Sequence, residues 1–308
     1  MQQALAPPGD FAGARFAGDH FISFDGARLG LSTWAPQGEP WAIVVGLHGM
    51  NDYAETFYLA GPYWAARGVA TYAYDARGFG RSPQRGVWAG EDLMIADLRA
   101  AVYAARKRHG EAVLGVVGES MGAAEAMAAF ASTEPPQADR LVLCAPAVWG
   151  WSALPMAYAV SLWAAAHTMP GKKVTPPRGL KITPSDNVEM LRKFGRDRNM
   201  LFDTRFDAIY GLVRLMETAA EAGPRLETPT AFLYGAHDQI VPRKAALKAA
   251  QRLPASARTG YYPLSYHMML RDLTARIVWD DILAFLSDSA APFPSGVGGV
   301  SKALTERG

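Results

Sequence analysis

The sequence has very little cysteine and no excess of either charge. Its 308 residues include one cysteine, Cys144, which excludes an intrachain disulfide, a thiolate zinc site and a CxxC redox pair. The 31 basic and 29 acidic residues give a net charge of +2, so there is no electrostatic reason to expect a nucleic acid partner. We therefore expect neither a nucleic acid ligand nor a metal centre.

Signals for export or membrane insertion are also missing. Residues 1–16 contain no basic cluster followed by an apolar run, as a secretory signal would. The stretch 145–170 has no Asp, Glu, Lys or Arg, but Gly150, Pro155 and His167 interrupt it, which favours a buried or interfacial helix over a membrane span. Together with the single cysteine, this predicts a cytoplasmic protein.

Apolar β-like runs alternate with helical stretches along most of the chain. Alternation of this kind predicts the α/β class, a mostly parallel sheet with helices on both faces. Eight runs have the length and composition of strands: 20–24, 28–34, 42–47, 69–74, 113–117, 141–144, 230–234 and 258–262. Helical periodicity is best in four stretches: 91–108, 121–131, 243–252 and 273–286.

The alternation fails once and divides the chain into unequal parts. The predicted core consists of residues 16–145 and 226–288. Between them, residues 146–225 show only helix and loop patterns and many apolar side chains, which predicts an inserted helical cap. The Ala-, Pro- and Gly-rich residues 1–15 predict a flexible N-terminal arm, and the Pro-, Gly- and Ser-rich residues 289–308 predict a flexible tail.

The motif most indicative of function is Gly-Glu-Ser-Met-Gly at residues 118–122, a G-x-S-x-G pattern between a predicted strand and an Ala-rich helical stretch. A serine on such a tight turn exposes its hydroxyl group, and larger side chains at the two glycine positions would clash. This context predicts that Ser120 is a nucleophile rather than part of an ordinary strand-to-helix turn.

A serine hydroxyl needs a base within hydrogen-bond reach and a carboxylate that orients the base. In hydrolases built on this turn, the acid and then the histidine follow the serine. His267 comes just after the last predicted strand and is the expected base, in preference to His167 and His237. Asp238, in the loop after the seventh predicted strand, is the expected acid. The competing interpretation is that Asp238 caps the next helix.

Hydrolysis also needs donors for the negative oxygen of the intermediate. We assign the backbone N–H groups of Met121, next to the nucleophile, and of Met50, in the loop that ends the strand 42–47. His48 is expected to brace this loop rather than act as a base, and Asp75 is expected to be structural. Glu119, beside the nucleophile, is expected to make a supporting hydrogen bond; the alternative is that it binds a substrate group.

These elements and their order resemble the α/β-hydrolase superfamily over residues ~20–288. The sequence looks most like its monoglyceride lipase and lysophospholipase branch, also catalogued with the serine aminopeptidases (S33). The resemblance depends on five motifs: residues 48–49, 75–82, 118–122, 235–238 and 266–267. It implies a cap inserted after the sixth strand. Many members carry a Glu-His pair soon after the His-Gly, whereas this chain has Met50-Asn51-Asp52-Tyr53.

The predicted cap is apolar and aromatic. It could wall a pocket for an acyl chain or contact a membrane surface transiently, which would make the protein peripheral to the membrane. Its candidate substrate-pocket residues are Trp149, Trp151, Met156 and Trp163. The alternative is that these side chains only pack the cap on the body.

The sequence therefore predicts a serine hydrolase of carboxylic esters that forms an acyl-serine and requires no cofactor or metal. The expected substrates are small-molecule or lipid esters, such as monoacylglycerol or lysophospholipid. Hydrolysis of an amide, peptide or carbon-carbon bond and acyl transfer remain alternatives with the same triad, as does a non-catalytic binding protein on this fold. The sequence does not indicate an oligomeric state.

Overall fold

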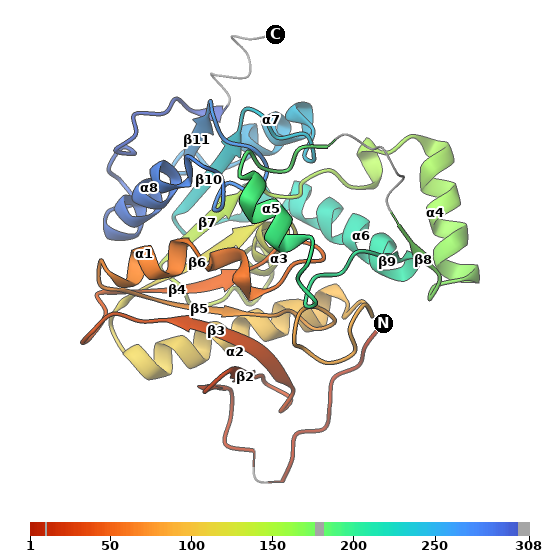
Figure 1. Ribbon diagram of the computed structural model, residues 1–308, viewed down its shortest axis with the longest axis horizontal. Helices are drawn as coiled ribbons and strands as arrows, with labels where there is room; N and C mark the ends of the chain where they lie inside the picture. The colour runs from red at the N-terminus through yellow and green to blue at the C-terminus, as the bar shows by residue number, and fades with distance from the viewer. Residues whose placement is uncertain (10, 176–181, 301–308) are drawn as a thin grey trace.

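The computed structural model describes residues 1–9, 11–175 and 182–300 (Figure 1). The strands are β1 (Arg15–Ala17), β2 (His20–Ile22), β3 (Arg28–Trp34), β4 (Ala42–Leu47), β5 (Val69–Tyr74), β6 (Val113–Glu119), β7 (Arg140–Cys144), β8 (Lys173–Val174), β9 (Thr204–Arg205), β10 (Thr230–Gly235) and β11 (Arg258–Tyr262). The helices are α1 (Ala60–Ala65), α2 (Glu91–His109), α3 (Met121–Phe130), α4 (Met156–Thr168), α5 (Val188–Phe194), α6 (Phe206–Ala222), α7 (Arg243–Gln251) and α8 (Ala275–Ser287). Short 3-10 turns are η1 (Ala54–Phe57), η2 (Trp151–Ala153) and η3 (Gly223–Arg225).

The main sheet has nine strands in the order β1-β2-β3-β5-β4-β6-β7-β10-β11. The six strands from β5 to β11 in this order are parallel, and β1, β2 and β3 continue the sheet with antiparallel pairs. The mostly parallel α/β-hydrolase sheet is therefore confirmed, but the predicted count of eight is wrong. The additional strand is β1, whose three residues are too few to produce a readable alternation.

Helices cover both faces of this sheet. Helices α1 and α8 lie on one face, while α2, α3 and α6 pack together on the other (Figure 1). Strand β4 is buried throughout, and its alternate residues enter the two cores: Ile43, Val45 and Leu47 on one side, Ala42 and Val44 on the other. A run of apolar residues without polar alternation is expected of a strand that is covered on both faces.

The order of the parallel strands creates a switch point between β4 and β6. From β4 the chain goes to β5 on one side, and then returns to β6 on the other side of β4. The loops after β4 and β6 therefore leave in opposite directions. In open α/β sheets, ligands bind in the crevice at the carboxyl ends of such strands.

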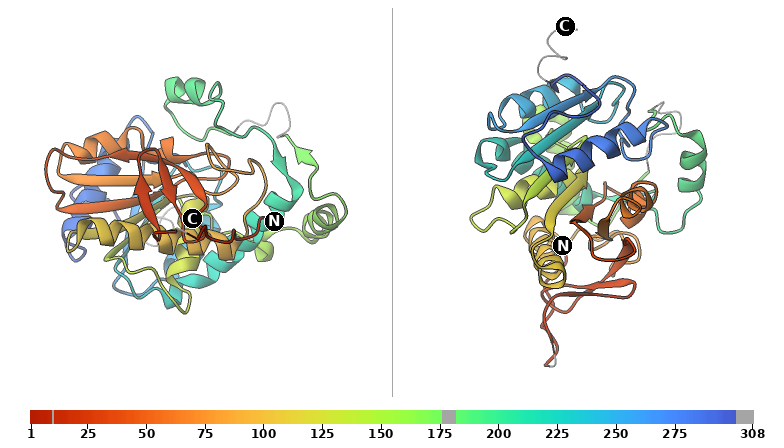
Figure 2. Two further views of the ribbon diagram at one scale, coloured as in Figure 1. Left: turned by 90° about the horizontal axis from the view of Figure 1, so that it is seen from below. Right: turned by 90° about the vertical axis from the view of Figure 1, so that its left-hand side faces the viewer.

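Residues 146–225, the insertion, leave the sheet after β7 and return before β10. The insertion contains α4, α5, α6 and a small antiparallel sheet of β8 and β9. Its residues 176–181 lie outside the described residues. Figures 1 and 2 show α4 standing away from the sheet. The uncharged stretch 145–170 contains the turn η2 and the 13-residue α4. No helix in the described part of the chain is long and apolar enough to cross a membrane.

The described parts of both terminal segments make contacts with the body, while the flexibility of the arm and the tail stays a prediction. Gln2 donates from its backbone N–H to the carbonyl of Trp88 at 3.0 Å, and the described residues of the arm end in β1. In the tail, Val300 is fully buried and Phe293 is 9% exposed. Composition missed these contacts because single anchoring side chains, not regular periodicity, hold both segments. Tail residues 301–308 lie outside the described residues.

Candidate active site

Ser120 lies at the turn between β6 and α3, as its motif predicts. Its backbone has φ 56° and ψ −113°, a left-handed conformation that costs a non-glycine residue free energy and that functional sites often retain. The two motif glycines make the turn possible. A Cβ atom at Gly118 would lie 2.5 Å from the carbonyl oxygen of Gly122, and one at Gly122 would lie 2.5 Å from the carbonyl oxygen of Leu47.

Asp238 and His267 come together across adjacent strands. Asp238 follows β10 and His267 follows β11, and the His267 Nδ1–H donates to Asp238 Oδ2 at 2.9 Å. The other carboxylate oxygen of Asp238 accepts the N–H groups of Ile240 and Val241 at 2.7 and 2.9 Å. The N-cap of α7 is Pro242, so Asp238 does not cap that helix. Its carboxylate instead fixes its own turn and orients the imidazole.

The charge environment of His267 suits a general base. Burial by itself lowers the pKa of the imidazole, but the adjacent Asp238 carboxylate and the more distant Glu119 outweigh it, so the net pKa of His267 is raised. The ring remains deprotonated and able to accept a proton only above this raised pKa. Activity that depends on His267 is therefore expected to fall as the pH falls.

The other candidate histidines do not lie in this arrangement. His237 is exposed, with its ring stacked on Tyr266, and His167 is exposed on α4. His48 is buried: its Nε2 accepts the N–H of Ala76 at 2.9 Å, and its Nδ1 donates to the carbonyl of Gly49 at 2.7 Å. Burial also lowers the pKa of His48. A neutral ring with both nitrogens engaged braces the loop after β4.

The two residues assigned to the oxyanion lie in the nucleophile turn and in the loop after β4. Met121 is the first residue of α3, where backbone N–H groups have no acceptor within the helix. Met50 lies in the loop after β4, next to Gly49. A Cβ atom at Gly49 would lie 3.4 Å from the Cβ of Ser120, so this loop passes directly beside the nucleophile.

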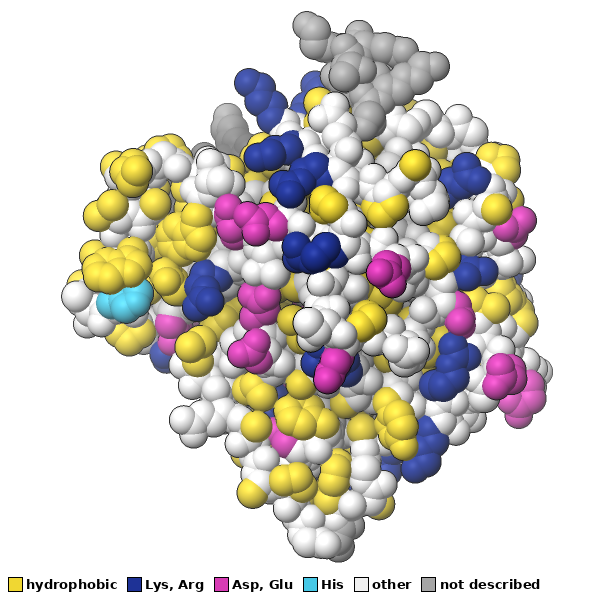
Figure 3. All heavy atoms as spheres, turned by 180° about the vertical axis from the view of Figure 1, so that it is seen from behind, with side chains coloured by type: hydrophobic (Ala, Val, Ile, Leu, Met, Phe, Trp, Pro, Cys, Tyr) yellow, Lys and Arg dark blue, Asp and Glu magenta, His cyan; other side chains and the backbone are white. Residues whose placement is uncertain are grey.

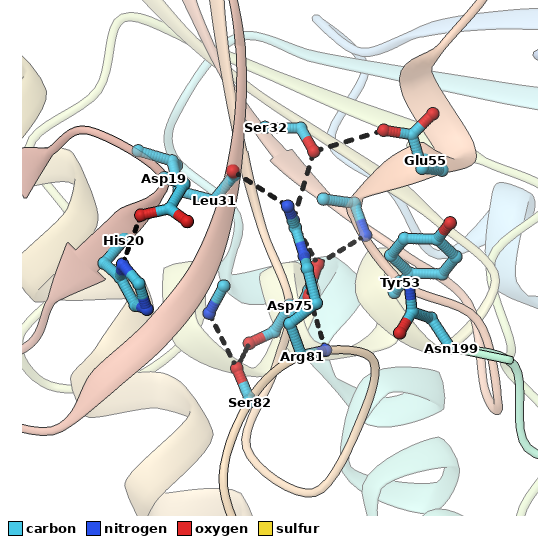
Figure 4. A network of polar contacts seen from close by, with 12 residues as sticks. Asp19, His20, Leu31, Ser32, Tyr53, Glu55, Asp75, Arg81, Ser82 and Asn199 are labelled. Carbon is cyan, nitrogen blue, oxygen red and sulfur yellow. Dashed lines mark hydrogen bonds and ion pairs between the residues drawn. The ribbon is translucent and has the colours of Figure 1, made fainter.

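Asp75 has a structural role, as the sequence predicts. Its carboxylate accepts the N–H of Ala54 at 2.9 Å and the N–H and Nε of Arg81 at 2.8 Å each (Figure 4). The Asp75 side chain is fully buried, and the loops after β4 and β5 meet on it. It therefore fixes the position of the loop that carries Met50 without lying at the reacting atoms.

Segment 182–187 of the insertion is attached to both loops that carry the acid and the base. The N–H of Met268 donates to the carbonyl of Pro184, and the N–H of Thr183 donates to Oε1 of Gln239, both at 2.9 Å. The Ser185 hydroxyl donates to Asp272 at 2.6 Å. The insertion thus contacts the residues next to Asp238 and His267.

Sequence reasoning missed Asp52, Arg271 and Asp272, which are buried together with Glu119 around this site. Arg271 forms ion pairs with Asp52 and Glu119. Nothing in the local sequence indicates these pairs, because their members lie 152 and 219 positions apart.

The predicted pocket residues of the insertion occupy different environments. Trp149 and Trp151 are half-buried against the core, whereas Met156 and Trp163 are 79% and 55% exposed. Trp151 and Trp163 line an apolar hollow of about 270 Å³ together with Ala159, Val160 and Tyr210. Their role in binding substrate stays a prediction.

A larger cavity of about 680 Å³ lies between the insertion and the start of α2. Its lining residues include Trp88, His167, Arg205, Tyr210, Gly211 and Arg214. Trp88 also lines a small space of about 10 Å³ that includes Met50, Phe79 and Leu201. The indole of Trp88 therefore stands between the large cavity and the loop assigned to the oxyanion. Within the described ranges, no cluster of His, Cys, Asp and Glu side chains is arranged to hold a metal ion.

The chain is similar in sequence to a known protein family and to two lipases. A family model described as serine aminopeptidase, S33, matches residues 38–274. A monoacylglycerol lipase of Mycolicibacterium smegmatis is 25% identical over 274 residues, which cover 86% of this chain and 95% of that protein. A monoglyceride lipase of Rattus norvegicus is 23% identical over 262 residues, which cover 82% of this chain and 84% of that protein.

Solved structures share the fold. The monoacylglycerol lipase of Paleococcus ferrophilus superposes with a TM-score of 0.71 at 18% identity, covering 85% of this chain and 99% of that chain. A soluble variant of the Saccharomyces cerevisiae monoglyceride lipase, solved with a substrate analog, gives 0.72 at 18% identity, with coverages of 92% and 100%. Because the family model spans well over half of the chain, the protein belongs to the serine aminopeptidase S33 family of α/β-hydrolases, the family that its motifs predict.

Proposed function

We propose that this protein is a serine hydrolase that cleaves carboxylic esters of lipids, such as monoacylglycerol or lysophospholipid, through an acyl-serine intermediate. The single observation that carries the proposal is the His267–Asp238 hydrogen bond, formed at the same sheet edge as the left-handed Ser120. The names of the relatives and of the similar structures, monoacylglycerol and monoglyceride lipases, support the substrate class.

The proposed reaction has two halves. His267, held by Asp238, takes the proton of the Ser120 hydroxyl, and the serine oxygen attacks the ester carbonyl. The backbone N–H groups of Met50 and Met121 stabilise the negative oxygen, and the alcohol leaves with the proton from His267. Water, activated by the same imidazole, then releases the fatty acid and regenerates Ser120.

The proposed cap is the insertion, residues 146–225, which contacts both loops of the proposed acid and base. We propose that the acyl chain passes Met50 and Trp88 toward the cavity of about 680 Å³ beside α2. This route is supported because Trp88 is the residue that borders both spaces.

Helix α4 is proposed to contact the lipid surface from which the substrate is taken. It has no buried residue, and no Asp, Glu, Lys or Arg occurs between its ends. Met156, Tyr158 and Val160 are 79%, 70% and 58% exposed, and Figure 3 shows hydrophobic side chains gathered on this projecting part of the molecule. Exposed apolar patches of this kind on a soluble domain mark interaction surfaces.

The test compares wild type, Ser120→Ala and the matched control Ser287→Ala, whose serine is exposed at the end of α8. The substrates are p-nitrophenyl esters from acetate to palmitate and the corresponding monoacylglycerols. We expect activity that rises with acyl length, a loss of about three orders of magnitude or more in Ser120→Ala, and little change in the control. A fluorophosphonate probe should label Ser120.

Two other results would change the proposal in different ways. If the probe labels Ser120 but no ester is cleaved, the triad stands and the substrate class is wrong, so amide or carbon-carbon bonds should be assayed next. If the probe does not label Ser120, the proposed nucleophile itself is wrong.

A further inference from the structure

Three buried charged side chains meet behind the proposed nucleophile. Arg271 Nη2 lies 2.6 Å from Asp52 Oδ2 and 2.9 Å from Glu119 Oε1. None of the three residues is more than 3% exposed. One guanidinium group is therefore shared by two carboxylates in a buried region that borders a small space of about 80 Å³. In such surroundings charge-assisted hydrogen bonds are strong and an unpaired charge is costly.

Each member of this cluster belongs to a different catalytic loop. Glu119 directly precedes Ser120. Asp52 ends the loop of Met50, where its N–H donates to the carbonyl of Gly49 at 3.2 Å. Arg271 lies on the loop that begins with His267. The cluster therefore joins the nucleophile turn, the proposed oxyanion loop and the histidine loop at one point.

Further hydrogen bonds fix the two carboxylates. Asp52 accepts the N–H of Tyr53 at 2.8 Å and the hydroxyl of Thr56 at 2.9 Å. The second oxygen of Glu119 accepts the N–H of Leu270 at 3.4 Å. Asp52 is thus held within its own loop, whereas Glu119 is held by two neighbouring residues of the histidine loop, Leu270 and Arg271. Because Arg271 contacts both carboxylates, it can keep a fixed spacing between the three segments.

The cluster also sets the charge near the imidazole. Two carboxylates and one guanidinium leave a net negative charge. Burial raises the pKa of Glu119, and the positive charge of Arg271 opposes that rise. Around His267, burial lowers the pKa, Asp238 and Glu119 raise it, and Arg271 lowers it. The Glu119 carboxylate that pairs with Arg271 at 2.9 Å therefore favours the imidazolium that forms when His267 takes the serine proton.

We propose that Arg271 is a positioning residue. Through Glu119 and Asp52 it fixes the positions of Ser120, Met50 and His267 relative to one another for catalysis. The proposal builds on the proposed function, since it assigns a role relative to that triad. It gives Glu119 two tasks: to anchor Arg271, and to favour the protonated state of His267 during the reaction.

The experiment measures kcat, KM and the pH dependence of kcat/KM for Arg271→Met, Arg271→Lys, Glu119→Gln and the double variant Glu119→Gln/Arg271→Met. For Arg271→Met we expect kcat to fall about 10- to 100-fold with KM little changed, since small misplacements of reacting groups cost that much. Arg271→Lys keeps the positive charge and should recover part of the loss. In the double variant the two losses should not add, because both residues act through one contact.

Glu119→Gln has an additional signature. Removing the negative charge makes the imidazolium of His267 less stable, so its pKa falls and the acid limb of the kcat/KM profile should move to lower pH. A purely structural role for Glu119 would lower the rate without moving this limb. An unmoved limb would therefore overturn the electrostatic part of the proposal.

Arg276→Met is the matched control, because Arg276 is 70% exposed on α8. Thermal unfolding shows which variants fold. If Arg271→Met does not fold, the kcat values of Arg271→Lys and Glu119→Gln test the positioning role instead. A folded Arg271→Met with wild-type kcat, or fully additive losses in the double variant, would overturn the positioning role.

Fluorophosphonate labelling of Ser120 separates the proposed function from this inference. If the wild type is not labelled, the proposed function fails, whereas equally fast labelling of wild type and Arg271→Met would refute only this inference.

Discussion

Asp272 is a buried carboxyl group whose ionisation falls in the physiological pH range. Burial raises its pKa to about 7, and the hydrogen bonds from Ser185 and the N–H of Tyr266 only partly offset this rise. The folded protein therefore holds a proton that the unfolded chain has already lost between about pH 4 and 7. Stability should fall as the pH rises through this window, because the ionised carboxylate is disfavoured in the fold.

Asp272→Asn should remove this pH dependence. The amide is neutral at every pH and can still accept the N–H of Tyr266 with its oxygen. The free energy of unfolding of the variant minus that of wild type should be larger at pH 8 than at pH 5. Urea unfolding at both pH values measures this difference. Asp288→Asn, at an exposed position, is the control and should leave the slope unchanged. Parallel pH profiles of wild type and Asp272→Asn would contradict the assignment.

The residues near the site divide into those that local sequence specifies and those that only the fold brings together. Ser120, Asp238 and His267 were predicted because each stands at a fixed place relative to a strand end, and the structure brings Asp238 and His267 into contact. Arg271 and Asp272 were missed because a buried charge is recognised by its partners. Those partners are distant in sequence, and a basic or acidic residue by itself predicts an exposed position.

At the scale of elements, the loop that carries Trp88 borders the large cavity. Gly86 and Gly90, with φ of 81° and 98°, flank it, and the Gln2 side chain donates to the carbonyl of Val87 at 2.8 Å. The indole packs tightly against α6: a Cβ atom at Gly211 would lie 2.1 Å from its Nε1. A side chain so closely confined can limit the length of an acyl chain that passes it.

Trp88→Leu should therefore shift the substrate preference toward longer acyl chains. Shortening the side chain would join the small space beside Met50 to the cavity of about 680 Å³. We expect the ratio of kcat/KM for palmitate to that for butyrate p-nitrophenyl esters to rise about tenfold, the scale of one or two methylene contacts. Trp41→Leu, at a 40% exposed tryptophan, is the control. An unchanged ratio combined with lower stability would mean that Trp88 only packs the core.

Sequence predicted the long elements better than the short ones. Runs such as β4 and β5 are continuous and apolar, and α2 extends over 19 residues, so their periodicity is readable. Strand β1 has three residues, and strands β8 and β9 have two each. Their conformation is therefore set by neighbouring segments rather than by a readable pattern of their own. The same limit applies to the tail, where Val300 is anchored by packing on the core.

At the scale of the whole molecule, the fold separates the proposed chemistry from the proposed lipid contact. The sheet brings the catalytic loops to its carboxyl edge, while the insertion carries α4 outward from the body (Figures 1 and 2). Helix α6, by contrast, packs on α3 against the body. This arrangement would let the molecule contact a lipid surface through α4 alone, without any change in the packing of the core.

The contact can be tested by removing apolar side chains that pack on nothing else. Met156 and Tyr158 are 79% and 70% exposed, so Met156→Ser/Tyr158→Ser should leave the fold intact. Burial of one such side chain in a lipid surface contributes about 1.5–3 kcal/mol, so binding to phosphatidylcholine vesicles should weaken at least about tenfold. Hydrolysis of monoacylglycerol in those vesicles should fall in parallel, whereas hydrolysis of soluble p-nitrophenyl butyrate should not change.

Tyr103→Ser, at a 57% exposed tyrosine on α2, is the matched control. Equal vesicle binding by wild type and the double variant would exclude α4 as the docking surface, and an equal loss in Tyr103→Ser would indicate nonspecific adsorption.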